Sequence, residues 1–342
     1  MTPRLQVWVA LGLVYVIWGS TYLAIKFVVA TVPPMLGMGM RFLLAGAILY
    51  TGTRLRGGPR PTPANWRAAA IVGILLLLCG NGVVAWSEQI VPSGLAALLV
   101  STTPLWMALI DWLRPGGIRP SLAVGVGLAL GFVGVMLLIG PNLLSGGATV
   151  RATGPLAIIS LLAIPLGSLA WASGSIYSRG AKMPASPALG TAMEMLAGGA
   201  AMLIVSIVAG EPAHLHFQSV TSRSLLGFLY LVVFGSLVAY SAYTWLLRTT
   251  PLSLTSTYAY VNPVVAVFLG WAFNNESLTP LTLLGAAIIV AAVGVITTFR
   301  SSQSSSQQQH EPASTDALSP ATQSGDRDPA HTPDDRAVAV GD

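Results

Sequence analysis

The chain has 342 residues, of which 54% are hydrophobic and only 8% carry a formal charge. A soluble domain carries roughly a quarter charged residues, so this composition excludes an ordinary soluble protein and favours a membrane protein. The net charge of +5 does not indicate a nucleic-acid-binding protein, because the basic residues are spread along the chain instead of forming one basic face.

Ten segments follow one another with the length and apolarity of membrane-spanning helices. Eight of them carry no charge: residues 5–25, 68–87, 89–110, 120–150, 152–178, 224–247, 249–275 and 277–299. Two carry one internal charge each, 34–53 with Arg41 and 187–210 with Glu194. About 20 residues of α-helix cross the hydrocarbon layer, and in lipid a helix satisfies its own backbone hydrogen bonds. We therefore predict an all-α polytopic membrane protein with ten transmembrane helices.

The basic residues predict the orientation. With ten spans both termini lie on one side of the membrane, and eleven basic residues fall on that side against two, Arg151 and Arg223, in loops on the other. The eleven are Arg4, Arg54, Arg56, Arg60, Arg67, Arg114, Arg119, Arg179, Lys182, Arg248 and Arg300. The positive-inside rule then places both termini in the cytoplasm.

The two ends of the chain differ in character. The apolar stretch after Arg4 is longer than a signal-peptide core and its motif recurs later, so we expect a retained first helix. Residues 301–342 contain seven of the twelve acidic residues and a Ser/Gln-rich run. Such a composition cannot bury enough apolar area to offset chain entropy, so we predict a disordered cytoplasmic tail.

An internal repeat relates the two halves. Shifts of 153 to 159 residues match Trp18 with Trp171, Lys26 with Arg179, Pro104 with Pro263 and Trp112 with Trp271. Each unit holds five spans, an odd number, so the second unit must enter the membrane from the opposite side. Inverted repeats of this kind are typical of secondary transporters, whose sites lie near the midplane between the repeats. We predict two inverted five-helix repeats, residues 5–141 and 152–300, around a central cavity.

Four stretches resemble the EamA family of the drug/metabolite transporter superfamily, most of all its YedA-like inner-membrane exporters. They are IWGSTYLAIK (17–26), VPPMLGMGMRFLLAG (32–46), GNGVVAWSEQIVPSGLAALLVSTTPLW (80–106) and STYAYVNPVVAVFLG (256–270). The resemblance covers about residues 8–298. It implies a ten-helix bundle with a central cavity that exports small metabolites or amphipathic compounds. The acid that the family places after the fourth span is matched by Glu276 but is replaced by RPGGIRP (114–120) in the first repeat, so the two halves are not expected to gate identically.

Arg41 and Glu194 occupy matching positions of the two repeats and carry opposite charges. Each lies about seven residues inside its span, roughly 10 Å deep at 1.5 Å per residue, so both are expected near the middle of the membrane. Ionisable residues at that depth are rare and often functional. Two readings stay open: a substrate-binding or coupling site across the repeat axis, or a fixed ion pair that joins two helices.

Glu88 ends the third span, after Asn81 and Trp86. A carboxyl at the membrane boundary can titrate in a useful range once it is desolvated, which makes Glu88 a second candidate for proton coupling or cation recognition. The alternative is a solvated interfacial acid. Asn81 and Asn262 are further candidates, because a buried amide needs a partner in the bundle or in a ligand.

Aromatic side chains away from the span ends are expected to line the cavity, where they suit amphipathic ligands. For each of them ordinary packing is the alternative. The set comprises Trp18, Tyr22, Trp86, Trp171, Tyr240, Tyr243, Tyr258 and Tyr260.

Pro104 and Pro263 lie at matching positions within their spans, where each removes a backbone hydrogen bond. The resulting bends are candidate hinges for alternating access, or static kinks. Lys26 and Arg179 lie at matching span ends, and we expect their side chains to extend to the lipid headgroups.

No cofactor, metal or catalytic site is predicted. The chain has no GxxxxGK[ST] loop, a single cysteine, Cys79, and four histidines, all in a loop or the tail. The expected partners are a small-molecule substrate and the lipid bilayer, without nucleic acid. Gly127 and Gly131 form a GxxxG face, for which close packing within the chain is favoured over a homodimer.

We predict a secondary transporter that exports small metabolites, amino acids or amphipathic compounds across the cytoplasmic membrane by alternating access. The substrate gradient or proton exchange would drive it. A carrier of anionic nucleotide-sugar compounds ranks lower, because only Arg41 and Lys26 supply positive charge to the cavity. From other classes, the alternatives are an intramembrane lipid-modifying enzyme, for which the spans lack clustered catalytic groups, and a membrane sensor or assembly protein.

Overall fold

The computed structural model describes residues 3–114, 122–144, 155–292 and 294–295. The predicted tail, 301–342, and most of the RPGGIRP loop lie outside these residues. Within the described part the fold is all-helical, which confirms the predicted class.

Seven helices are long and apolar enough to cross a membrane. They are Arg4–Val29, Pro34–Leu55, Pro63–Ser87, Ser93–Leu113, Pro155–Gly180, Pro187–Val208 and Ser222–Thr249. Three shorter apolar helices, Leu122–Leu137, Val261–Asn274 and Pro280–Ala292, lie within the remaining predicted segments. The count of ten spanning helices stays a prediction.

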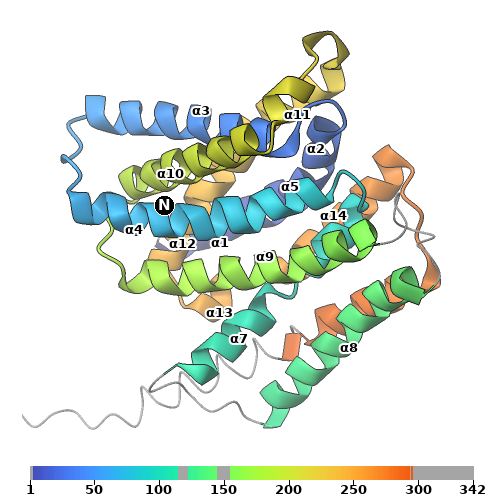
Figure 1. Cartoon of the computed structure of the whole chain (residues 1–342). Coiled ribbons are helices and arrows are strands. Elements are labelled where there is room, and N and C mark those ends of the chain that lie inside the picture. The colour runs from blue at the N-terminus through green and yellow to red at the C-terminus, as the bar shows by residue number, and fades with distance from the viewer. Residues whose placement is uncertain (1–2, 115–121, 145–154, 293, 296–342) are drawn as a thin grey trace, which may run out of the picture.

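Several long helices are composed of successive elements (Figure 1). The first half of the chain contains α1 (Pro3–Leu13), η1 (Val14–Trp18), α2 (Gly19–Val29), α3 (Pro34–Leu55), α4 (Pro63–Gly73), η2 (Ile74–Gly82), α5 (Val83–Ser87), α6 (Ser93–Val100), α7 (Thr103–Leu113) and α8 (Leu122–Leu144). The second contains α9 (Pro155–Gly180), α10 (Pro187–Val208), η3 (Glu211–His214), η4 (Phe217–Ser219), α11 (Ser222–Tyr230), η5 (Leu231–Tyr240), α12 (Ser241–Thr249), α13 (Leu252–Thr255) and α14 (Tyr258–Asn274).

Helix starts follow from local sequence. Pro63 opens α4 after Thr62, whose hydroxyl accepts from the Asn65 backbone while the Asn65 side chain accepts from the Thr62 backbone. This reciprocal pair satisfies two of the amide groups that a helix start leaves without partners. Ser186 and Thr221 cap α10 and α11 through their hydroxyls, which accept from the backbone amides of Leu189 and Ser224 without a reciprocal bond.

Three spans contain π-helical turns, which the sequence analysis did not predict. They are η1 in the first span, η2 in the third and η5 in the eighth. A π-turn widens the helix and rotates the residues that follow, and such turns are frequent at functional sites. Because the third and eighth spans are matched by the repeat, η2 and η5 lie in corresponding parts of the two halves.

Small residues bring α3 and α10 close together, side by side in Figure 1. A Cβ atom added at Gly199 would lie 2.9 Å from the Leu43 backbone nitrogen, and one at Gly46 would lie 3.1 Å from the Ala192 carbonyl oxygen. Close backbone approach through small residues is the usual way in which membrane helices pack. At the edge of the bundle, α8 packs in the same manner: a Cβ at Gly131 would meet Leu105 of α7, which favours intrachain packing for that GxxxG face.

The first long helix of each half packs against helices of the other half. In the first half α2 packs against α11 and α14, and the matched helix α9 of the second half packs against η2 and α6. At one end of the bundle Asn65 Nδ2 donates to the Lys182 carbonyl at 2.7 Å. This contact joins the two basic loops that the positive-inside analysis places on the same side of the membrane.

Pro104 and Pro263 have different settings. Pro104 lies in the first turn of α7, after a break at residues 101–102 that divides the span, and the Val100 carbonyl accepts from the Thr103 hydroxyl at 2.7 Å. Pro263 lies inside α14, and the break in its span comes earlier, at residues 256–257. The two bends are therefore not equivalent, and a hinge function for either one stays a prediction.

Candidate functional site

A central cavity with about 650 Å³ of atom-free space lies between the two halves. Six of the predicted site residues line it: Trp18, Tyr22, Arg41, Asn81, Trp171 and Tyr240. The described lining also includes Tyr258 from the predicted aromatic set, and Thr21, Ile25, Phe42, Leu77, Gly80, Val84, Val100, Gly167, Ser168 and Gly235, which the sequence analysis did not single out. Most of these are small or aliphatic residues whose types carry no functional signal.

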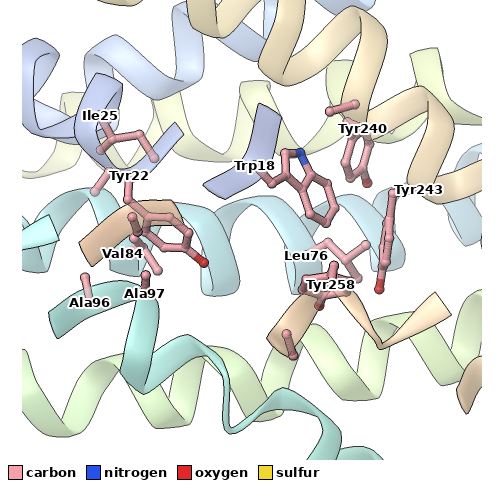
Figure 2. Close-up of a cluster of buried hydrophobic side chains, with 14 of the residues drawn as sticks. Trp18, Tyr22, Ile25, Leu76, Val84, Ala96, Ala97, Tyr240, Tyr243 and Tyr258 are labelled. Carbon is pink, nitrogen blue, oxygen red and sulfur yellow. The ribbon is translucent and has the colours of Figure 1, made fainter. Parts of the chain in front are cut away.

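Aromatic rings from both halves line the central cavity and form its aromatic wall: Trp18, Tyr22, Phe42, Trp171, Tyr240 and Tyr258. Figure 2 shows Trp18 beside Tyr240, Tyr243 and Tyr258. The repeat-matched Trp18 and Trp171 contact each other edge to face, with ring centroids 5.4 Å apart. Trp18 also contacts Tyr243 at 4.8 Å and Tyr258 at 5.4 Å. Tyr243 lies behind the wall and fixes it, because its hydroxyl accepts from Trp171 Nε1 at 2.9 Å and also bonds the Ser175 hydroxyl.

The expected meeting of Arg41 and Glu194 is not observed. Arg41 Nε donates to Ser236 Oγ at 2.9 Å, whereas Glu194 Oε2 accepts from the Tyr240 hydroxyl at 2.8 Å. Ser236 and Tyr240 both lie on η5, four residues apart. Each charge is therefore held by η5, and the two face different environments although their helices pack together. Arg41 lines the central cavity, and Glu194 lies behind Tyr240.

The two candidate asparagines have different roles. Asn81 lines the central cavity, and its Oδ1 has no hydrogen-bond partner among the described residues. Asn262 is buried and does not line it. In the orientation that satisfies its amide, Asn262 Nδ2 donates to the carbonyls of Tyr15 at 3.0 Å and Tyr258 at 3.2 Å. Asn262 thus joins α14 to η1.

A second cavity, here called the end cavity, lies beyond the central one. Its lining includes Lys26, Glu88, Gln89, Arg223 and Asn274, and its atom-free space is about 660 Å³. Residues of α2 contribute to both cavities: Tyr22 and Ile25 to the central cavity and Lys26 to the end cavity. This segment of α2 therefore borders both cavities.

Glu88 lies at the end cavity, in the connection between the spans Pro63–Ser87 and Ser93–Leu113. It is fully buried, and neither carboxyl oxygen has a hydrogen-bond partner among the described atoms. Burial raises the pKa of the Glu88 carboxyl well above its usual range, and the positive charge of Lys26 opposes that rise only in part. The reading of Glu88 as a solvated interfacial acid is therefore wrong.

Lys26 does not extend to the lipid headgroups. It is buried, and its Nζ donates to the carbonyl oxygens of Glu88 and, at 2.9 Å, of Val91. The matched Arg179 donates to the Thr250 carbonyl at 3.0 Å. Each cation thus attaches the first helix of its repeat to the connection between the third and fourth.

Two carboxylates join the halves at the end of the bundle that holds Glu88. Glu276 accepts from the backbone amides of Ser93 at 2.9 Å and Gly94 at 3.0 Å, at the N-terminus of α6. Glu211 accepts from the amides of Met35 and Leu36, at the start of α3. A carboxylate at a helix N-terminus satisfies free amide groups and interacts favourably with the helix dipole. Glu276 thus caps α6. From the sequence, Glu276 was identified only as the match to an acid that the family places after the fourth span.

The remaining candidates do not join the central cavity. Trp86 is half-buried near the end of α5 and lines neither cavity. The side chain of Tyr260 lies outside the described residues. No group of three or more His, Cys, Asp or Glu residues that could hold a metal ion occurs in the described part of the chain.

Comparison with known proteins identifies relatives over most of the chain. The EamA-like transporter family matches residues 6–140 and again 158–298. "Uncharacterized inner membrane transporter YedA" of Escherichia coli (strain K12) is 40% identical over 292 residues, covering 84% of this chain and 89% of that protein. Protein PecM of Dickeya dadantii is 27% identical, covering 82% of this chain and 88% of PecM.

Two more distant proteins match a similar share of this chain. A WAT1-related chloroplastic protein of Arabidopsis thaliana is 26% identical over 84% of this chain and 69% of its own length. One solved crystal structure, at 21% sequence identity, superposes with a TM-score of 0.60 over 86% of this chain and 97% of that chain. At that identity the likeness concerns the fold alone.

Proposed function

The chain belongs to the EamA-like transporter family, and from this premise we propose that it is a secondary transporter that exports small metabolites, amino acids or amphipathic compounds by alternating access. Its relatives and its apolar helices indicate a multi-pass protein of the inner membrane. The proposed architecture is ten helices in two inverted repeats, with both termini in the cytoplasm.

The observation that carries the proposal is the central cavity at the junction of the two halves. Its aromatic wall is built by repeat-matched residues, Trp18 and Trp171, from opposite halves. A mainly apolar cavity with a few polar groups is the usual form of a small-molecule site. A site between inverted repeats can be opened to either side when one half rocks against the other.

Separate sets of contacts at the two ends of the bundle support alternating access. At one end Lys26, Glu211 and Glu276 connect helices to loops and to helix starts. At the other end Arg179 donates to the Thr250 carbonyl and Arg248 to the Pro184 carbonyl at 3.1 Å. In the proposed cycle one set opens while the other stays closed.

Proton exchange is proposed as one source of energy, with Glu88 as the coupling group. Its buried carboxyl has no hydrogen-bond partner among the described atoms and lies next to Lys26 at the end cavity. A proton taken up there would change the net charge beside α2, the helix that borders both cavities. The substrate gradient alone is the alternative source.

Efflux from proteoliposomes tests the proposal. Purified protein is reconstituted, loaded with a pool of amino acids, organic acids and aromatic amines, and assayed by mass spectrometry of the released compounds against empty liposomes. At least one compound should leave faster from the loaded proteoliposomes. Trp171→Ala should lower that flux about tenfold, the change that corresponds to roughly 1.4 kcal/mol of lost contact energy.

The matched control is Trp112→Ala, because Trp112 is 44% exposed on α7 and lines neither cavity. This variant should transport at the wild-type rate. Equal release from protein-containing and empty liposomes for every compound, at two opposite pH gradients, would refute transport. Chemical conversion of a compound without its release would indicate an enzyme instead.

A further inference from the structure

Arg41 is a buried cation without a counter-ion among the described residues. Its side chain is buried, with 2% of its surface exposed. Among the described residues the ion pair that forms is Arg114 with Asp111, at the C-terminal end of α7, and neither residue lines the central cavity. Arg41 Nε donates to Ser236, its Nη1 makes a long contact of 3.5 Å with the Met38 sulfur, and its guanidinium carbon lies 4.5 Å from the centre of the Phe42 ring. No partner for Nη2 lies among the described residues.

The described lining of the central cavity contains no acidic residue that could neutralise Arg41. Glu194 is engaged by the Tyr240 hydroxyl behind the wall, and Glu88 lies at the end cavity. An unpaired buried charge is strongly unfavourable, and it is relieved when an anion with matching hydrogen-bond geometry binds. A guanidinium presents two parallel N–H groups that fit a carboxylate in a bidentate manner.

The surroundings of Arg41 restrict the kind of anion. One cation compensates one negative charge, so a di- or trianionic phosphate would bring uncompensated charge into an apolar cavity. The Phe42 ring lies against the guanidinium, and Tyr240, Trp18 and Trp171 supply further aromatic rings to the lining of the same cavity. Such walls favour a flat or apolar body attached to the anionic group. Asn81, with its unsatisfied amide oxygen, is available for a further hydrogen bond.

We propose that the central cavity selects amphipathic monocarboxylates, with Arg41 binding the carboxylate and the aromatic wall binding the apolar body. This substrate class rests on the proposed transport function and deepens it. An ammonium group finds no acidic partner in the described lining, so amines of the same shape bind weakly. Ser236 positions Arg41 by holding Nε, which leaves the two Nη groups without a charged partner and available to the ligand.

Three compounds with one carbon skeleton test the selection: 3-phenylpropionate, 3-phenylpropanamide and 3-phenylpropylamine, which carry charges of −1, 0 and +1 at pH 7. Their dissociation constants are measured by calorimetry on the full chain in detergent. The carboxylate should bind at least ~10-fold more tightly than either other compound, as expected for charge-assisted hydrogen bonds. Arg41→Gln should weaken carboxylate binding at least ~10-fold and leave amide binding within about threefold. Arg41→Lys should retain part of the preference, since it keeps the charge and loses the bidentate geometry.

The control is Arg60→Gln, which removes an exposed arginine in the loop between α3 and α4 and should leave all three constants unchanged. Amide binding by Arg41→Gln reports that this variant is folded, and Arg41→Lys provides the test if it is not. The proposal is overturned if the amine or amide binds as tightly as the carboxylate, if the carboxylate does not bind, or if Arg41→Gln keeps the preference. The proposal is also overturned if chloride binds in an Arg41-dependent manner and the carboxylate does not bind. Selective carboxylate binding without efflux would refute the proposed transport function and leave the proposed substrate selection standing. Efflux of amines and amides at the carboxylate rate would support transport and refute the selection.

Discussion

Each buried charge of the bundle has its own environment, and Arg41 and Glu194, on neighbouring helices, do not meet. Arg41 is held by Ser236 and Glu194 by Tyr240, both from η5. Lys26 donates to backbone carbonyls, while the adjacent Glu88 carboxyl has no hydrogen-bond partner in the described part of the chain. Arg41, which lines the central cavity, and Glu88, which lies at the end cavity, are therefore well placed to respond to a ligand or a proton.

The thermal stability of the protein should depend on pH through Glu88. Its pKa is raised in the folded protein by burial, so the folded state binds this proton more tightly than the unfolded state. The associated stabilisation is fully present below the pKa of the unfolded carboxyl, about 4.3. It is lost as the pH rises through the higher pKa of the folded protein. Glu88→Gln has no carboxyl to titrate, so it should not lose this stability as the pH rises. The Tm of Glu88→Gln relative to that of the wild type should therefore rise with pH until the folded pKa of Glu88 is passed.

The measurement is the Tm of both proteins in detergent across that pH range. Parallel Tm curves for the wild type and Glu88→Gln would contradict a raised pKa at this residue. In proteoliposomes the same variant should lose the response of efflux to a pH gradient if Glu88 couples transport to protons.

At the level of helices, backbone contact between α3 and α10 joins the two halves next to the central cavity. The contact depends on glycines, because any side chain there would meet backbone atoms of the facing helix. The amide of Leu43 and the carbonyl of Gly39 lie closer than van der Waals contact to a Cβ placed at Gly199. The π-helical turns η2 and η5 are the second device at this level, since they set the rotation of Asn81 and Tyr240 relative to the cavity.

Gly199→Ala should destabilise the fold by about 1–3 kcal/mol, the usual cost of forcing extra volume into a packed contact. The added methyl group would lie 2.9 Å from the Leu43 nitrogen and 3.0 Å from the Gly39 carbonyl oxygen. Gly52→Ala on the facing helix α3 is the control, because a Cβ there meets nothing within 4 Å. Unfolding in a denaturing detergent measures both, and equal stability of the two variants would refute the close contact.

For the molecule as a whole, the two ends of the bundle differ in their connections. One end holds the basic loops joined by Asn65 and Lys182, and the other holds the carboxylate contacts of Glu211 and Glu276 and the end cavity. A protein with these two ends can bind a substrate in the middle and open each end separately. The orientation in the membrane is predicted by the basic residues alone.

Accessibility labelling tests the orientation. In a Cys79→Ser background, single cysteines at Arg56, Lys182 and His214, all exposed in the structure, are treated in intact cells with a membrane-impermeant maleimide. The cysteine at His214 should react from outside, and those at Arg56 and Lys182 should react only after the membrane is opened. Reaction of Arg56 and Lys182 positions from opposite sides would refute the inverted repeat, and labelling of both from outside would reverse the orientation.

The sequence by itself determined the helical class, the positions of the apolar segments and the family, because hydrocarbon-length runs and recurring motifs are properties of contiguous residues. It also singled out six of the residues that line the central cavity, through their polar or aromatic types within apolar spans.

Only the tertiary structure decided which partner each buried polar group takes. Arg41 bonds Ser236 instead of Glu194, Asn262 joins α14 to η1, and Lys26 binds carbonyls. The physical reason is that side-chain direction depends on helix rotation. The π-helical turns in η1, η2 and η5 change this rotation, and no residue pattern in those segments marks them. A serine such as Ser236 becomes a partner of a buried arginine only when the packing of distant helices brings the two together.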